Sequence, residues 1–367
     1  MFRRAPNGPR AKRAQSLSQA VLGEGPPRSG RVRGSALAST ITRTHVGAAA
    51  PPAPARFPGT PVRILSDLPL DPRLTEQRNP ASTDIDRLSA LEIVRVINDE
   101  DHRVAPAVAG QLEQVARAVE MAEDTFRRGG RLIYVGAGTS GRLGVLDSSE
   151  MPPTYGTDPK MVQGVIAGGE RALTRAVEGA EDSREDGGAA VDGLEVTRDD
   201  FVFGIAASGT TPYVHGALTR AAQRGARTGF LLCTPPQEWM LEVYDVVIAV
   251  LVGPEVVTGS TRMKAGTATK LVLNTITTGA MIRLGKVFGN LMVDLRATNQ
   301  KLQDRSERIL METLDLDRAS AADLLAEAGG SVKTAMVMRW RGVGQDQATR
   351  LLRRAGGRLG EVLGQER

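Results

Sequence analysis

Between residues 131 and 252, five short apolar segments alternate with stretches of helical pattern, and this alternation restricts the possible folds most strongly. The segments are apolar along their whole length, which is typical of strands buried on both faces. Strands that alternate with helices form parallel sheets covered on both sides. The sequence therefore predicts an α/β fold with a doubly wound, five-stranded parallel sheet. The strand candidates are residues 131–135, 161–167, 201–207, 228–233 and 245–252.

Helical patterns surround the sheet region, because apolar residues recur there at three- and four-residue steps. They predict helices over residues 84–97, 108–126 and 172–184, and a helical chain after residue 260. The predicted organisation is N-terminal helices at 75–120, a sheet domain at 121–285, a linking helix at 286–314 and a small helical, UBA-like subdomain at 315–367.

The basic residues are concentrated in positions 1–64, which hold eleven Lys and Arg residues and one acid, Glu24. This Pro- and Gly-rich segment has no apolar periodicity, so we expect a disordered basic extension. The whole chain carries +5 and the segment +10, so residues 65–367 carry −5. The high pI thus belongs to the extension, and we expect no nucleic-acid partner.

Other classes of protein are disfavoured by what the sequence lacks. The longest apolar run, residues 246–252, is far shorter than the ~20 residues of a membrane-spanning helix. The single cysteine, Cys233, fits a reducing compartment, and we expect a cytoplasmic protein. The three histidines and Cys233 form no metal-ligand spacing, and we expect neither metal nor cofactor. Acid–base chemistry would therefore fall to carboxylates, lysines or tyrosines.

Two loops rich in Gly, Ser and Thr follow the first and third strand candidates, at residues 136–142 and 207–212. Helix N-termini after such loops offer free N–H groups to an anion, and the carboxyl ends of parallel strands face one crevice. The loops therefore predict a phosphate site. The first loop also resembles a dinucleotide fingerprint, but the second strand candidate does not end in the acidic residue that binds ribose. The candidate ligand-binding residues are Thr139, Ser140, Ser208, Gly209 and Thr211.

The two loops resemble those of sugar isomerase (SIS) domains, five-stranded parallel sheets that bind phosphosugars. Further segments are similar to N-acetylmuramic acid 6-phosphate etherases, and the resemblance covers about residues 75–365. One position departs from the family pattern, because Thr210 stands where we expect an arginine. The segments that carry the resemblance are residues 75–79, 97–101, 136–142, 149–156, 178–183 and 256–266, the last of which is shared with glucokinase regulatory proteins.

The resemblance implies a homodimeric enzyme of cell-wall sugar recycling that converts N-acetylmuramic acid 6-phosphate to N-acetylglucosamine 6-phosphate and D-lactate. It places the two catalytic glutamates of the family on Glu150 and Glu181. The chemistry fits two carboxylates, because removing the C2 proton of the open-chain sugar and protonating the C3 ether oxygen requires one base and one acid. Which glutamate is the acid stays open.

The local sequence around these residues also permits structural roles. Glu150 precedes Pro152 and is expected to end a helix, and Glu181 lies in an acidic stretch typical of a solvated helix face. Ten helical residues separate Ser140 from Glu150, about 15 Å, so either the loop contacts the sugar end of the substrate or a second subunit contributes. Ser260 and Lys264 lie at the start of the last helical region. A cation at a helix N-terminus opposes the helix dipole, so its position predicts either a bound anion or a salt-bridged surface.

Three other functions share parts of this pattern. A non-catalytic phosphosugar sensor of the glucokinase regulatory type would not need Glu150 and Glu181. A SIS-type transcription regulator would need a basic helix-turn-helix, which the extension lacks. An aldose–ketose isomerase would also need a base near C2, and the fold alone does not exclude it.

Overall fold

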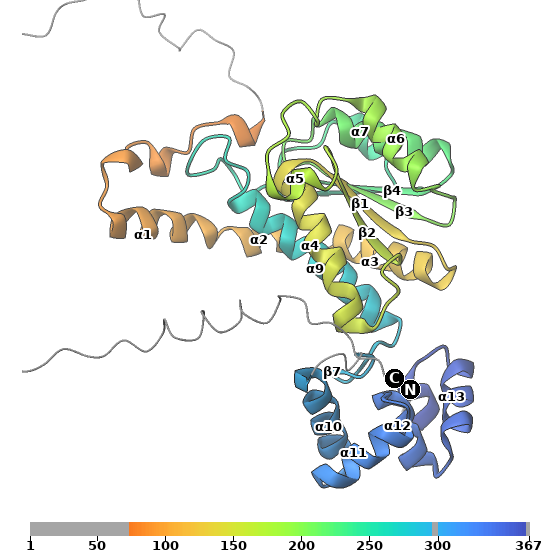
Figure 1. Cartoon of the computed structure of the whole chain (residues 1–367). Helices are drawn as coiled ribbons and strands as arrows, with labels where there is room; N and C mark the ends of the chain where they lie inside the picture. The colour runs from red at the N-terminus through yellow and green to blue at the C-terminus, as the bar shows by residue number, and fades with distance from the viewer. Residues whose placement is uncertain (1–72, 296–299, 365–367) are drawn as a thin grey trace, which may run out of the picture. The chain divides into compact units, whose positions relative to one another are not determined.

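The computed structural model describes residues 73–295 and 300–364 (Figure 1). These residues belong to one compact unit, Ser66–Arg367. The predicted disordered extension, residues 1–64, lies outside the described residues. No helix in the described part is long and apolar enough to cross a membrane.

A five-stranded parallel sheet forms the centre of the chain, which confirms the predicted fold class. The strand order is β2-β1-β3-β4-β5, so the direction in which strands are added reverses at β1. Leu132 of β1 pairs with Val162 of β2 on one side and with Phe201 of β3 on the other. The strands are β1 (Leu132–Gly136), β2 (Val162–Ile166), β3 (Phe201–Ile205), β4 (Arg227–Leu232) and β5 (Val246–Ala249).

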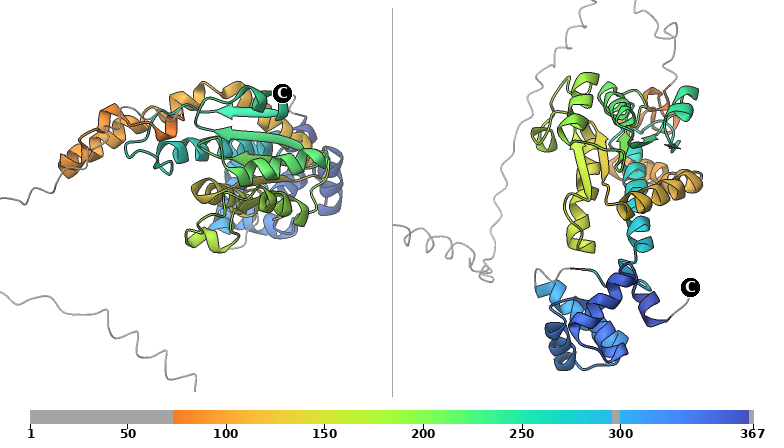
Figure 2. Two further views of the ribbon diagram at one scale, coloured as in Figure 1. Left: turned by 90° about the horizontal axis from the view of Figure 1, so that it is seen from above. Right: turned by 90° about the vertical axis from the view of Figure 1, so that its right-hand side faces the viewer.

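Helices cover both faces of the sheet, as the wholly apolar strands require (Figure 2). On one face Tyr134 and Phe203 pack against α2, α3, α4 and α9. On the other face Ile133 and Val202 pack against α6, α7 and α8. The helices of the first face are α2 (Val104–Ala109), α3 (Leu112–Arg127), α4 (Gly138–Tyr155) and α9 (Lys264–Arg283), and those of the second are α6 (Arg184–Gly193), α7 (Pro212–Gln223) and α8 (Glu238–Val243).

The N-terminal segment enters through three short 3-10 turns before α1 (Ala90–Asp101). The predicted helix over 84–97 therefore begins later than expected. The reason is a capping box, in which the Ser89 hydroxyl accepts from the Glu92 N–H and the Glu92 carboxylate accepts from the Ser89 N–H. The turns are Leu74–Glu76, Pro80–Ser82 and Ile85–Arg87.

The helix predicted over residues 172–184 is wrong. Only α5 (Arg171–Thr174) is helical there, and the chain then runs as a loop until Ser183 caps α6. Gly179 in this loop has a φ of +74°, a left-handed conformation that an α-helix does not contain. Of the acidic stretch, Glu178, Glu181 and Asp182 therefore lie in a loop, whereas Glu185 and Asp186 lie in the first turn of α6.

The linking helix predicted over 286–314 is also shorter than expected. A hairpin of β6 (Val287–Phe288) and β7 (Leu291–Met292) precedes α10 (Gln300–Leu314). Helix α10 packs in the core of the C-terminal helices, so the helical subdomain includes it. The other helices of this core are α11 (Arg318–Glu327), α12 (Val332–Arg341), α13 (Gln345–Arg354) and α14 (Leu359–Leu363).

Candidate active site

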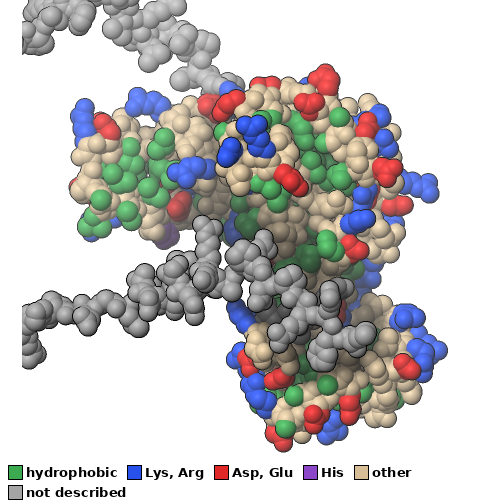
Figure 3. Space-filling view, viewed as in Figure 1, with side chains coloured by type: hydrophobic (Ala, Val, Ile, Leu, Met, Phe, Trp, Pro, Cys, Tyr) green, Lys and Arg blue, Asp and Glu red, His purple; other side chains and the backbone are tan. Residues whose placement is uncertain are grey.

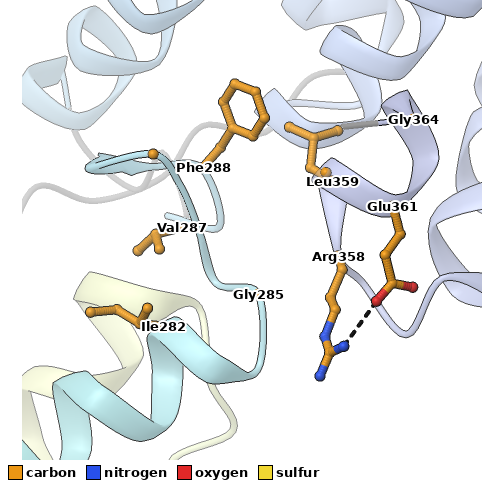
Figure 4. Close-up of a pocket in the computed structure, with 10 residues that line it drawn as sticks. Ile282, Gly285, Val287, Phe288, Arg358, Leu359, Glu361 and Gly364 are labelled. Carbon is orange, nitrogen blue, oxygen red and sulfur yellow. Dashed lines mark hydrogen bonds and ion pairs between the residues drawn. The ribbon is translucent and has the colours of Figure 1, made fainter. Parts of the chain in front are cut away.

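Two cavities in the described residues differ sharply in chemistry. The larger, about 750 Å³, lies between the end of α9, the β6 strand and α14 (Figure 4). Its charged lining groups, Arg358 and Glu361, form an ion pair of 2.9 Å with each other, and no hydroxyl side chain lines it. A smaller cavity of about 380 Å³ is lined by carboxylates, hydroxyls and one guanidinium. The smaller cavity is the better candidate for acid–base chemistry on a sugar.

The smaller cavity, called the switch-point pocket below, lies at the carboxyl ends of β1 and β3. In a sheet of order 2-1-3-4-5 the strand order reverses there, and the loops leave a crevice in which ligands bind. The N-terminus of α4 begins in one of these loops and offers backbone N–H groups to an anion. At the start of α7, Pro212 has no N–H, and the N–H groups of Tyr213 and Val214 donate to the carbonyls of Glu181 and Thr211. The pocket brings together five of the residues predicted from the sequence, Thr139, Ser140, Glu181, Ser208 and Thr211.

Gly209 does not line the pocket but shapes the loop that does. Its φ of +76° favours glycine, and a Cβ there would lie 3.1 Å from the Leu232 side chain. Its carbonyl oxygen lies 2.8 Å from Nε2 of His215, whose Nδ1 lies 2.7 Å from the Tyr244 hydroxyl. His215 is buried, and burial lowers its pKa, so the imidazole is a neutral positioning group beneath the 208–211 loop.

Glu181 reaches the pocket because the loop before α6 is fixed against α7. Its carbonyl oxygen accepts a hydrogen bond of 3.0 Å from the backbone N–H of Tyr213, in the first turn of α7. The two helices approach closely at Gly216, where a Cβ would collide with the carbonyl oxygen of Arg184. The exposed Glu181 side chain is thereby held beside the loop that follows β3.

Glu150 lies elsewhere. It is exposed on α4 and lines a separate cavity of about 230 Å³ together with Leu146 and Lys270. The expectation that Glu150 ends its helix is wrong, because α4 continues through Pro152 to Tyr155. Pro152 and Pro153 both lie inside this helix, where a proline costs about 3 kcal/mol, and the buried side chains of Met151 and Tyr155 on either side of them favour the helical conformation.

The position of α4 next to Glu150 is fixed by the buried carboxylate of Asp147. It accepts hydrogen bonds from the Tyr134 hydroxyl at 3.0 Å, from Asn274 Nδ2 at 2.6 Å and from the Thr277 hydroxyl at 3.2 Å. Burial raises the pKa of Asp147. These bonds join α4 to β1 and α9, so Glu150 projects from a rigid support.

The structure places Lys264 in a buried ion pair with Glu100 and not on the lining of the switch-point pocket. The buried Glu255 carboxylate accepts hydrogen bonds of 3.0 and 2.9 Å from the N–H groups of Lys264 and Ala265. Glu255 thus accepts from the first N–H groups of α9, and the charge of Lys264 is paired with Glu100. Of the two alternatives left open for this position, a bound anion or a salt bridge, the structure has the salt bridge, in a buried form. Ser260 also lies outside the pocket lining, although its neighbours Gly259 and Thr261 are part of it.

Sequence reasoning missed three charged groups of the pocket, Arg73, Glu76 and Asp182. The backbone N–H of Gly259 donates to the Thr75 carbonyl at 3.1 Å and holds this segment at the pocket. Glu76 lies in the segment 75–79 that carries the family resemblance, and Asp182 in the segment 178–183, whereas Arg73 lies outside both segments. Among the described residues, no group of three or more His, Cys, Asp or Glu side chains is arranged to hold a metal ion.

Comparison with known proteins gives a consistent result. Residues 114–222 match the family model of the glucokinase regulatory protein N-terminal SIS domain. The N-acetylmuramic acid 6-phosphate etherase of Nostoc punctiforme is 52% identical over 279 residues, which cover 76% of this chain and 90% of that protein. The etherase of Photorhabdus laumondii is 52% identical over 285 residues, which cover 78% and 94%. The solved structure of phosphoheptose isomerase from Neisseria gonorrhoeae is 17% identical, with a TM-score of 0.40, and covers 51% of this chain and 99% of that one.

A doubly wound parallel sheet with a hydroxyl-lined switch point, together with the matching family model, places the chain in the SIS class. The two etherases identify the family within this class, because the sequence identity of 52% extends over nine-tenths or more of their length. The chain belongs to the N-acetylmuramic acid 6-phosphate etherase family, a family of lyases. This confirms the resemblance found in the sequence.

The lowered pKa of His215 predicts a pH-dependent stability. Burial lowers the pKa of the folded imidazole, so it takes up a proton at a lower pH than the imidazole of the unfolded chain, which binds a proton below about pH 6.5. Unfolding is therefore favoured as the pH falls below that value, by at most about 1.4 kcal/mol per pH unit for one group. Urea unfolding at pH 7.5 and 5.5 should show a smaller loss of stability for His215→Gln than for the wild type. The exposed His102→Gln is the control, and an unchanged pH slope in His215→Gln would contradict the role given to burial.

Proposed function

We propose that the switch-point pocket binds N-acetylmuramic acid 6-phosphate and that the chain releases D-lactate from it by elimination followed by hydration. The observation that carries the proposal is the position of Glu181, which faces the same 380 Å³ pocket as Ser140, Ser208 and Thr211. A phosphate bound by these hydroxyls and by the N-terminus of α4 would leave the sugar carbons near the Glu181 carboxylate. The single cysteine, which is buried and reduced, is consistent with a cytoplasmic reaction.

The proposed reaction uses two carboxylates. In the open-chain sugar the C1 aldehyde acidifies the C2 proton, and one glutamate removes it. The other glutamate protonates the ether oxygen on C3, and lactate leaves as a C2–C3 double bond forms. Water then adds to C3 and a proton returns to C2, which gives N-acetylglucosamine 6-phosphate. Each placed acid or base of this kind contributes about 10²–10⁴-fold to the rate.

We further propose that Glu150 acts in the site of a partner subunit of a homodimer. Ten residues of α4 separate it from Ser140, about 15 Å, which is longer than a hexose phosphate. Its surroundings are suited to a protein contact, because Leu146, which is 47% exposed, lines the same cavity of about 230 Å³ as Glu150. Exposed apolar groups of this kind mark interaction surfaces when they are close together.

Helix α1 offers a second apolar surface for the same partner. Leu91 and Val94 are 60% and 61% exposed, and Figure 3 shows hydrophobic side chains gathered over this helix. A twofold axis would present the same patches on both subunits, which is the usual arrangement of a homodimer. The dimer would thus bury apolar groups that are exposed in the single chain and complete the acid–base pair.

Replacing either glutamate by glutamine should stop catalysis while leaving the substrate bound. Glutamine keeps the size of the side chain but cannot exchange a proton, so we expect kcat to fall by about 10²-fold or more in Glu150→Gln and in Glu181→Gln, with little change in KM. Release of D-lactate is the measurement. Glu178→Gln, on the loop of Glu181 but outside the pocket lining, should keep wild-type kcat. Full activity of both site variants would contradict the assignment, and a wild-type chain that binds the sugar phosphate without releasing lactate would favour a regulator.

Mixed dimers test whether the site is shared. A dimer of one Glu150→Gln subunit and one Glu181→Gln subunit holds one intact site if Glu150 acts across the interface, and none if both glutamates come from one subunit. Random pairing of the two inactive variants should therefore restore about a quarter of the wild-type activity. Co-expression with two affinity tags allows the mixed dimer to be isolated. An inactive mixed dimer would show that the pair is not shared.

A further inference from the structure

The cavity of about 230 Å³ that contains Glu150 is also lined by an ammonium group. Lys270 lines it from α9, which lies beside the helix of Glu150, α4 (Figure 1). Of the described residues that line this cavity, Lys270 is the one cation. Its ammonium donates a hydrogen bond to the side-chain oxygen of Asn274, which is a neutral amide. The positive charge therefore remains available to an anionic ligand.

We propose that Lys270 binds the lactyl carboxylate of the substrate and so selects sugar phosphates that carry the lactyl ether. The inference rests on the proposed function, in which Glu150 reacts with the sugar. Whether Glu150 is the acid or the base, its target is the ether oxygen on C3 or the proton on the neighbouring C2. The lactyl group is attached to that oxygen, whereas the phosphate is on C6. A residue that shares the cavity of Glu150 therefore meets the lactyl end of the substrate.

The direction of the ammonium is set by a chain of hydrogen bonds that starts at the buried Asp147. The Asp147 carboxylate accepts from Nδ2 of Asn274 at 2.6 Å and so fixes the orientation of that amide. Oδ1 of Asn274 then accepts from Lys270, which lies one helical turn earlier on α9. An ammonium has several N–H groups, so this bond holds the lysine at the cavity and leaves others for a carboxylate.

The remaining walls of the cavity suit the rest of the lactyl group. Leu143, Leu146 and Leu273 line it with apolar side chains. The central carbon of a lactyl group carries a methyl group, a carboxylate and the ether oxygen. The leucines can cover the methyl group, which favours its transfer out of water. The carboxyl group, the cation and the apolar wall thus match the ether oxygen, the carboxylate and the methyl group of one leaving group.

The charges of the proposed site give a further reason for a cation here. The lactyl carboxylate has to approach Glu150 in this cavity and Glu181 in the switch-point pocket. Like charges repel one another at short range, and a nearby ammonium offsets that repulsion. The lactyl carboxylate carries the same charge in the bound substrate and in the departing lactate. Lys270 therefore contributes to the binding of the substrate more than to the chemical step.

The test uses ligands that differ only at the lactyl group. They are N-acetylmuramic acid 6-phosphate, the analogue in which its lactyl carboxylate is a neutral amide, and N-acetylglucosamine 6-phosphate, which has no lactyl group. Dissociation constants are measured by calorimetry in the Glu181→Gln chain, so that the substrate is not consumed. The same chain is then compared with and without a second substitution at Lys270.

Lys270→Met should weaken the binding of N-acetylmuramic acid 6-phosphate about tenfold or more and change the other dissociation constants by less than about twofold. Lys270→Arg keeps the charge and should retain most of the affinity. Lys270 is exposed, so neither substitution removes a buried group. Lys160→Met, at an exposed lysine outside the cavity lining, is the matched control and should leave all the affinities unchanged.

Unchanged affinity of Lys270→Met for N-acetylmuramic acid 6-phosphate would overturn the inference. A similar loss for every ligand would also overturn it, because the lysine would then act on the phosphate or on the fold. A loss in Lys270→Arg as large as that in Lys270→Met would show that the charge is not what matters. Failure of the proposed function appears separately, as a wild-type chain that releases no D-lactate. The binding measurements do not depend on that release.

Discussion

The reversal of strand order at β1 is the constraint on which the rest of this structure depends. It separates the chain connections after β1 and β3, so that their two loops border one crevice at the carboxyl ends of the strands. Each loop leads into a helix, α4 after β1 and α7 after β3, and carries hydroxyl side chains into the crevice. The hydroxyls of Ser140 and Ser208, though 68 positions apart by their numbering, therefore meet in one pocket. The topology therefore provides a crevice lined by hydroxyl groups before any charged residue is considered.

Buried polar groups in this protein hold the site in place and are not themselves the reacting groups. His215 supports the 208–211 loop, Asp147 ties α4 to β1 and α9, and Glu100 joins the N-terminal segment to Lys264. Each is buried and hydrogen-bonded, which avoids the cost of an unpaired polar group in the interior. Glu150 and Glu181, in contrast, are exposed and able to meet a ligand or a second subunit. Buried groups thus hold the helices and loops in place, and exposed carboxylates are left to contact a ligand or a second subunit. This is the arrangement expected of a preorganised site.

The parts of the fold that depend on local pattern were predictable from the sequence, and those that depend on distant contacts were not. Continuous apolar runs identified all five strands, and the Ser/Thr/Gly loops identified the pocket. The helix expected around Glu181 failed because its loop is set by the contact of α6 with α7 and by the φ of Gly179. The environment of Lys264 was hidden because its partner, Glu100, lies 164 positions earlier. The pairing of Arg73 with Thr210 was hidden for the same reason.

The central claim is that lactate leaves by elimination from the switch-point pocket, and the fate of the C2 hydrogen tests it most directly. The wild-type chain can be incubated with N-acetylmuramic acid 6-phosphate in D₂O, and the product examined by mass spectrometry and proton NMR. Elimination and rehydration require the C2 proton to be lost to a glutamate and replaced from solvent, so N-acetylglucosamine 6-phosphate should carry deuterium at C2. Product that forms with its original hydrogen at C2 would contradict elimination and indicate direct displacement of lactate.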